Sequence, residues 1–287
     1  MPYAEVNQVN HYFEWVGTDG HTPAAEKPVM VFVHGWAGSS RYWESTAHAL
    51  ADDFDCLLYD MRGFGRSTID PQQQDAVKQR GYELETFADD LAELLRALGL
   101  SKVYLNAHSM GASVAVFFMN RYPEWVERAV LTCNGIFEYD KKAFETFYRF
   151  GGYVVAVRPQ WLSKIPGVPS LFMSRFLSQP IPPQEKVAFL EDFLTADYDT
   201  ALGTIFTSVS KKATEVMPVE FSQIQIPTLL VSGEFDQITP AQLGENAASL
   251  NPKIEYALVK GTGHFPMLED PKTYLGFVHQ FLGKASA

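Results

Sequence analysis

Short apolar runs alternate with helical patterns along most of the chain. Residues 29–35, "VMVFVHG", form a continuous run of β-branched and other apolar residues that ends at a glycine. Such a run predicts a strand buried on both faces of a sheet. Similar runs predict further strands at 54–60, 102–107, 126–135, 226–233 and 253–261.

Helical periodicity fills the intervals between these strands. Apolar residues recur at helical spacing from Leu84 to Leu98, and Gly99 then provides a stop signal. Residues 111–123, "GASVAVFFMNRYP", predict a buried helix that ends at a proline, and other helices are predicted at 40–50, 240–250 and 270–282. Alternating strands and helices predict an α/β fold, with a mostly parallel sheet flanked by helices. Ligands bind such sheets at the carboxyl ends of the strands.

The alternation stops after Ile136 and resumes near residue 217. The intervening segment contains helical patterns and no clear strand, and it is rich in prolines and aromatic residues. The sequence therefore predicts a core of residues 1–136 and 217–287 with an inserted helical cap at 137–216. The aromatic residues either pack the cap onto the core or line an apolar substrate pocket, and both interpretations stay open. The candidate pocket residues are Trp36, Phe144, Trp161 and Phe265.

Composition and charge narrow the range of partners. The 287 residues are 46% hydrophobic and 20% charged, as in ordinary globular proteins, and the formal net charge is −11. An acidic chain is not expected to bind nucleic acid or anionic lipid. The sequence has no signal-peptide pattern and no apolar run of membrane-spanning length, so we expect a cytoplasmic monomer or homodimer with no membrane partner. Cys56 and Cys133 lie in predicted strands and are expected to be buried free thiols. No cluster of Cys and His predicts a metal site.

Ser109 stands at a predicted junction between a strand and a helix. Ala107 and Gly111 lie two residues before and after it. A sharp turn at this point would lift the serine above the sheet edge, and small residues are needed where the turn is crowded. The alternative is an ordinary N-cap serine.

A candidate acid and a candidate base follow Ser109 along the chain, each after a predicted strand. Asp236 comes just after one late strand, and His264 lies in a glycine-bracketed loop after the next. Glu234 is the rival candidate for the acid. For the oxyanion, the backbone N–H groups of Met110 and Trp36 are the candidate donors.

These features resemble the α/β-hydrolase superfamily, and the matching motifs occur in that family's order across nearly the whole chain. They are "HGW" at 34–36, "YDMRGFGRS" at 59–67, "AHSMG" at 107–111, "GEFDQITP" at 233–240 and "GTGHFPMLEDP" at 261–271. The resemblance implies that Asp60 and Arg62 are architectural. It also implies that Ser109 excludes the aspartate-nucleophile branches as the main chemistry. Met110 departs from the tryptophan typical of proline iminopeptidases, and Phe265 departs from the tryptophan typical of C–C bond hydrolases.

The resemblance implies hydrolysis of a small, hydrophobic carboxylic ester through an acyl-enzyme, without metal or cofactor. Lactone opening, peracid formation and C–C bond hydrolysis with the same triad remain alternatives. A small-molecule receptor with slow turnover is a further alternative.

Overall fold

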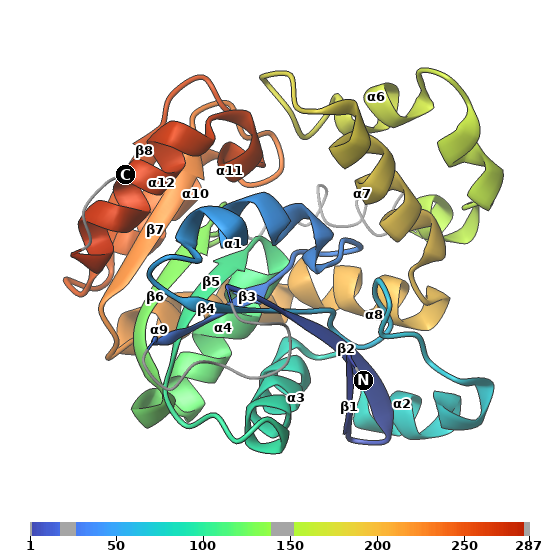
Figure 1. Cartoon of the computed structure of the whole chain (residues 1–287), viewed down its shortest axis with the longest axis horizontal. Coiled ribbons are helices and arrows are strands. Elements are labelled where there is room, and N and C mark those ends of the chain that lie inside the picture. Colours follow the sequence, from blue (N-terminus) through green and yellow to red (C-terminus); the bar gives the residue numbers. More distant parts are fainter. Residues whose placement is uncertain (1, 18–26, 139–151, 284–287) are drawn as a thin grey trace.

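A computed structural model of the chain describes residues 2–17, 27–138 and 152–283. Eight strands form one sheet in the order β1-β2-β4-β3-β5-β6-β7-β8 (Figure 1). Strands β3 to β8 run parallel to one another. Strands β1 and β2 form an antiparallel hairpin at one edge, where β2 pairs antiparallel with β4. Their bounds are β1 (Tyr3–Val6), β2 (Val9–Val16), β3 (Val29–Val33), β4 (Asp55–Tyr59), β5 (Val103–His108), β6 (Val126–Thr132), β7 (Thr228–Gly233) and β8 (Ile254–Val259). The predicted fold class is confirmed.

Helices cover both faces of the sheet. On one face pack α3 (Leu84–Ala97), α4 (Met110–Arg121), α9 (Lys211–Gln223) and α10 (Ala241–Ser249). On the other face pack α1 (Glu44–Leu50) and α12 (Pro271–Leu282). The remaining short helices are η1 (Ser40–Trp43), η2 (Pro71–Gln73), α2 (Gln74–Arg80), η3 (Pro123–Trp125) and α11 (Pro266–Glu269).

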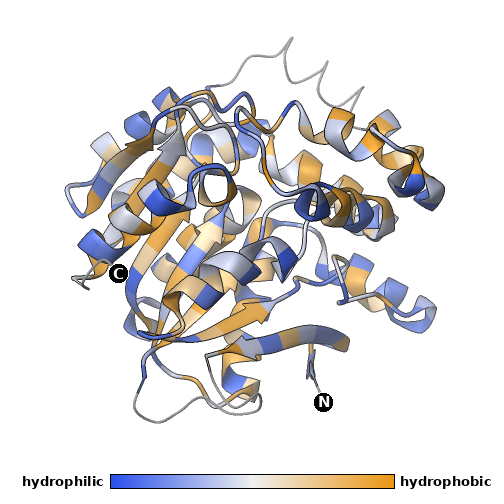
Figure 2. Ribbon diagram, turned by 45° about the horizontal axis from the view of Figure 1, so that its top comes forward, coloured by the Kyte–Doolittle hydropathy of each residue, from blue (hydrophilic) through white to orange (hydrophobic). Residues whose placement is uncertain are grey.

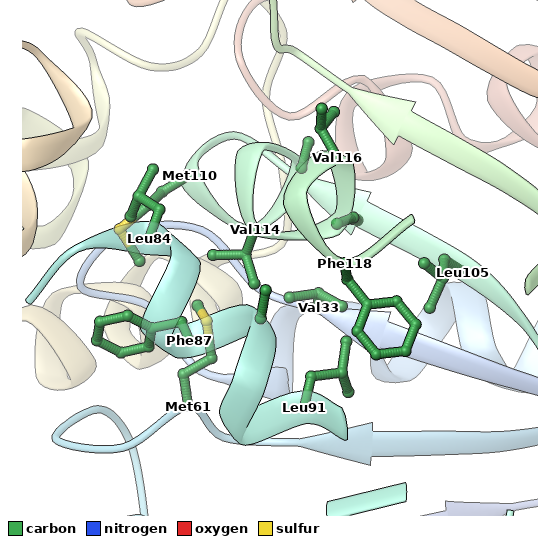
Figure 3. Close-up of a cluster of buried hydrophobic side chains, with 14 of the residues drawn as sticks. Val33, Met61, Leu84, Phe87, Leu91, Leu105, Met110, Val114, Val116 and Phe118 are labelled. Carbon is green, nitrogen blue, oxygen red and sulfur yellow. The ribbon is translucent and has the colours of Figure 1, made fainter. Parts of the chain in front are cut away.

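The parallel strands are apolar on both sides because both faces are covered. In β3, Val31 and Val33 face the α3–α4 layer, whereas Met30 and Phe32 face the α1–α12 layer. Figure 2 shows hydrophobic colouring along the central strands and mixed colouring on the helices around them. Side chains of α3 and α4 meet over β3 and β5, where Phe87 and Phe118 are among the largest (Figure 3). This packing fixes α4, and therefore its first residue, against the strand ends.

The segment between β6 and β7 is helical where it is described. It contains η4 (Gln160–Lys164), α6 (Val168–Met173), α7 (Pro183–Thr195) and α8 (Tyr198–Ser208), and α6 and α7 lie side by side (Figure 1). The predicted cap boundary at residue 217 falls inside α9. This helix packs against α4 and α10 of the core layer and also against α8.

Several smaller expectations can be checked in the same structure. Cys56 and Cys133 are both buried and both free. The β1–β2 hairpin was not predicted; it turns at Asn7 and Gln8, which both have positive φ (51° and 68°). Among the helices that the structure describes, none is both long enough and apolar enough to cross a bilayer.

Candidate active site

Ser109 lies at the sharp turn between β5 and α4. Its backbone has φ 54° and ψ −122°, a conformation that a non-glycine residue rarely adopts. Its N–H donates to the Thr132 carbonyl oxygen at 2.9 Å, which ties the turn to the end of β6. Strained conformations of this kind occur at functional sites, where the surrounding structure holds them in place. The expected nucleophile elbow is therefore present as geometry.

The small residues around the turn are explained by close contacts. A Cβ on Gly111 would lie 2.2 Å from the His34 carbonyl oxygen and 2.7 Å from that of Val33. Ala107 is fully buried in β5 beside Leu131 of β6. Only glycine permits α4 to begin so close to the end of β3, and alanine is small enough at 107.

His264 joins Ser109 to Asp236. Its Nε2 lies 3.0 Å from Ser109 Oγ, and its Nδ1 lies 2.7 Å from Asp236 Oδ2. Because the carboxylate only accepts, Nδ1 carries the proton and Nε2 is free to accept from the serine hydroxyl. All three predicted residues are thus brought together in hydrogen-bonding order.

Backbone donors hold the Asp236 carboxylate in place. Its Oδ1 accepts from the N–H of Ile238 at 2.7 Å and from that of Thr239 at 3.0 Å. The rival carboxylate, Glu234, accepts instead from the Gly261 N–H at 2.8 Å and is exposed. Asp236 therefore occupies the position beside the imidazole, and Glu234 braces the loop that leads to His264.

Two unpaired backbone donors lie next to the serine. Met110 is the first residue of α4, where a helical N–H has no intrahelical acceptor, and Trp36 follows Gly35 in the loop after β3. Within the described part of the chain, neither N–H donates to a protein acceptor. The Trp36 indole N–H donates to the Ala201 carbonyl oxygen of α8 at 2.9 Å, which links this loop to α8.

A cavity of about 70 Å³ opens at Ser109. Trp36 and Phe265 line it, as predicted. The aromatic and aliphatic walls that the sequence analysis did not identify are Phe176, Phe189 and Ile238. For Phe176 and Phe189 the only signal was the dense aromatic content of the segment between β6 and β7, which did not distinguish these positions from their neighbours. Ile238 lies in the motif at 233–240, two residues after Asp236.

Trp161 has to be corrected as a candidate pocket residue. It lies in the short helix η4, is 60% exposed, and lines a separate cavity of about 470 Å³ with Arg41, Arg66 and Lys164. That cavity does not include Ser109 or His264, so Trp161 does not contact the serine site. Phe144 lies outside the described residues.

Buried polar groups near the site have structural partners. His34 Nδ1 donates to the Gly35 carbonyl oxygen at 2.8 Å, and its Nε2 accepts from the Met61 N–H at 2.9 Å. Burial lowers the pKa of His34, consistent with this neutral form. Asp60 accepts from the Ser40 and Arg66 N–H groups, and Arg62 pairs with Asp90 at 2.7 Å. The motif at 59–67 is therefore a scaffold beside the site.

One group of side chains has the spacing of a metal site. The potential ligand atoms of His108, Cys133 and His264 all lie within 4.8 Å of one another. Metal binding to cysteine needs the thiolate, but burial raises the pKa of Cys133 well above its usual value. His108 and His264 are also engaged in hydrogen bonds with other groups. The chemistry of this donor set does not favour a metal ion.

Comparison with known proteins agrees with this fold. The sequence model of the family described as "alpha/beta hydrolase fold" matches residues 28–271. The chain belongs to the α/β-hydrolase family. A proline iminopeptidase from Heyndrickxia coagulans is 28% identical over 270 residues, covering 89% of this chain and 90% of that protein.

Solved structures of this family share its fold. A bromoperoxidase from Bacillus anthracis superimposes with a TM-score of 0.79 at 24% identity, covering 98% of this chain and 99% of its own. A thermophilic esterase from Thermogutta terrifontis superimposes with a TM-score of 0.76 at 23% identity, covering the whole of both chains. At these identities, the likeness establishes the fold alone.

Proposed function

We propose that this α/β hydrolase is a serine hydrolase that cleaves carboxylic esters of small, hydrophobic substrates through an acyl-enzyme. The observation that carries the proposal is the continuous chain from Ser109 Oγ to His264 Nε2 at 3.0 Å and from His264 Nδ1 to Asp236 Oδ2 at 2.7 Å. A serine hydroxyl is a weak nucleophile until a base accepts its proton, and the base needs an orienting acid.

The reaction proceeds in two halves. Ser109 Oγ attacks the ester carbonyl carbon while its proton passes to His264 Nε2. His264 then gives this proton to the leaving alcohol as the carbon–oxygen bond breaks. In the second half, His264 takes a proton from water, and the resulting attack on the acyl-enzyme releases the carboxylic acid and restores the serine.

Charge that develops during these steps meets fixed partners. Asp236 stabilises the transient imidazolium of His264, and the two backbone N–H groups that hold its Oδ1 keep the carboxylate in position. The N–H groups of Met110 and Trp36 are the proposed donors to the oxyanion. Loss of one such donor lowers the rate by about 10² to 10³ in comparable sites.

The size of the cavity favours a short acyl group. A volume of about 70 Å³ at Ser109 is small beside the roughly 300–1,000 Å³ of typical ligand pockets. Phe176 and Phe189 of the cap segment and Phe265 of the core close it with aromatic walls. An acetyl or similarly small acyl group suits such a space better than a long chain does.

The test is p-nitrophenol release from acetate, butyrate and octanoate esters, with Ser109→Ala as the critical variant. A matched control is Ser113→Ala, one turn along α4, whose hydroxyl accepts from Asn134 Nδ2 at 2.9 Å. We expect turnover that falls with chain length, that Ser109→Ala abolishes and that Ser113→Ala retains. Wild-type turnover in Ser109→Ala would overturn the proposal.

The same panel separates the other reactions open to this triad. Lactones, peroxide-dependent peracid formation and N-terminal proline amides are assayed beside the esters. A higher kcat/KM for one of these classes, lost in Ser109→Ala, would keep the nucleophile and replace the ester as substrate. A single stoichiometric release followed by no turnover would instead favour a receptor.

A further inference from the structure

A buried chain of hydrogen bonds runs from the loop after β3 to the backbone of His264. The Gly35 N–H donates to the hydroxyl of Tyr42. The same hydroxyl lies 3.0 Å from His108 Nδ1, and His108 Nε2 lies 2.7 Å from the His264 carbonyl oxygen. Tyr42 and His108 are 3% and 1% exposed, so water does not substitute for these partners.

The chemistry of the two ends fixes the direction of every bond between them. The His264 carbonyl oxygen only accepts, so His108 Nε2 carries the proton. In a neutral ring Nδ1 is then an acceptor, and the Tyr42 hydroxyl donates to it. The Gly35 N–H only donates, so it fills a lone pair of the same hydroxyl. The Tyr42 hydroxyl and the His108 ring each donate one hydrogen bond and accept one, and the chain ends in a pure donor at Gly35 and a pure acceptor at His264.

This chain of hydrogen bonds joins two parts of the site that the reaction needs in a fixed relative position. Gly35 immediately precedes Trp36, one proposed oxyanion donor, and His108 immediately precedes Ser109. The His108 ring also packs on the ring of His264, with centroids 4.7 Å apart, and on Phe265 at 4.8 Å. Both backbone and ring of His264 therefore rest on His108.

We infer that Tyr42 and His108 are positioning residues, which hold the base His264 and the oxyanion loop at Gly35–Trp36 in a single fixed arrangement. The inference rests on the proposed function, because it assigns these residues a task in the same reaction. It extends the site beyond the triad to the buried Tyr42 and to His108, which lines the cavity next to Ser109. Neither residue donates or accepts a proton during turnover.

The electrostatic surroundings agree with a permanently neutral His108. Burial lowers its pKa well below the ordinary range, and the neighbouring imidazole of His264 acts in the same direction. A charged ring would place a second proton on Nδ1, where the Tyr42 hydroxyl already donates. The chain would then lose its single consistent direction.

The experiment compares two tyrosine variants that each lose one buried hydroxyl. Tyr42→Phe keeps the ring contacts with Trp43 and Phe265 but leaves the Gly35 N–H and His108 Nδ1 without their partner. Tyr274→Phe is the matched control, since its hydroxyl is also buried and bonds Thr132 and Asn106, each at 2.9 Å. Ester turnover and thermal unfolding are measured for both.

We expect Tyr42→Phe to lower kcat by about 10-fold to 10²-fold, the range expected when a reacting group is slightly misplaced, with KM changed by less than about twofold. The two variants should lose similar amounts of thermal stability, because each loses one buried hydroxyl. Tyr274→Phe, however, should leave kcat at the wild-type value. Equal kcat in Tyr42→Phe and wild type would overturn the inference. A kcat loss in Tyr274→Phe as large as that in Tyr42→Phe would also overturn it.

A second pair of variants tests the linkage itself. His108→Gln retains one donor and one acceptor and should recover part of the activity that His108→Leu loses. The double variant Tyr42→Phe/His108→Leu should be no slower than His108→Leu alone, because one break already interrupts the chain. Multiplying effects would contradict the linkage. Retained activity in Ser109→Ala would refute the proposed function, whereas abolished activity there with full activity in Tyr42→Phe would refute this inference alone.

Discussion

Replacing Gly111 by alanine tests how closely α4 approaches β3. The added Cβ would lie 2.2 Å from the His34 carbonyl oxygen, whereas real Cβ contacts stay above about 3.0 Å. The helix or the strand must therefore separate by at least 0.8 Å, the difference between these two distances. Both nearest oxygens belong to the backbone at the end of β3, which pairs with β4 and β5 and has little freedom to move.

The expected cost follows from this rigidity. Overpacking a core lowers the free energy of unfolding by about 1–3 kcal/mol. Because the Gly111→Ala side chain would meet backbone atoms, which cannot move aside as a side chain can, we expect a loss of about 3 kcal/mol or more. At roughly 2–4 °C per kcal/mol for a domain of this general size, Tm should fall by at least about 6 °C. Because α4 carries Ser109 and Met110 at its start, an ~1 Å shift should also lower kcat about 10²-fold.

The control is Gly276→Ala in the middle of α12, where a Cβ meets nothing within 4 Å. Alanine is favoured over glycine inside a helix, so this variant should gain about 0.5–1 kcal/mol. Urea unfolding of both variants, followed by circular dichroism, gives the free energies. A Gly111→Ala protein within about 0.5 kcal/mol of wild type and fully active would refute this reasoning.

Other predictions address the acid, the pocket and the helix α7. Asp236→Asn should lower kcat by about 10⁴, because the amide favours the wrong imidazole tautomer, whereas Glu234→Gln should stay within a few-fold in the same ester assay. Phe189 lines the cavity at Ser109, so Phe189→Ala should enlarge this cavity and raise the ratio of kcat/KM for octanoate to that for acetate. An unchanged ratio would show that Phe189 does not limit the chain length of the substrate. Burial raises the pKa of Asp192 to about 6 from its usual 3.8. The folded state therefore retains a proton that the unfolded chain loses, and the free energy of unfolding falls as pH rises from about 4 to 6. In urea unfolding measured across this pH range, Asp192→Asn should show a smaller fall in the free energy of unfolding with rising pH. The same pH dependence in Asp192→Asn and wild type would contradict the raised pKa of Asp192.

The regular elements of the core could be predicted because each has a clean apolar pattern. The predicted strand at 29–35 is β3 at Val29–Val33, and the predicted helix that Gly99 stops is α3 at Leu84–Ala97. The β1–β2 hairpin was missed because its turn is Asn7-Gln8. Glutamine is an unusual residue at positive φ, so the usual Asn-Gly signal was absent.

The hydrogen-bonded grouping of Ser109, Asp236 and His264 was predictable because each of them follows the end of a strand. What separates Asp236 from Glu234 is the pair of backbone donors at Ile238 and Thr239, and no sequence pattern reports where those N–H groups point. Geometry also decided the pocket. Trp161 and Phe189 both lie in an aromatic-rich segment, yet only Phe189 faces Ser109, because the orientation of α7 and η4 on the core depends on long-range packing.

His108 shows the same limit at a single residue. Its position next to Ser109 does not indicate what its ring contacts. The ring is directed toward Tyr42 and the His264 carbonyl oxygen. A partner 156 residues away in the chain is outside the reach of local patterns.

The central claim is that His264 activates Ser109 as the nucleophile. The most direct measurement is reaction with a fluorophosphonate, which modifies only an activated serine, followed by mass spectrometry of the digested protein. The account predicts one covalent adduct per chain on Ser109, absent in Ser109→Ala and formed at least about 10³-fold more slowly in His264→Ala. An adduct at another serine with hydrolytic activity intact in Ser109→Ala would contradict it.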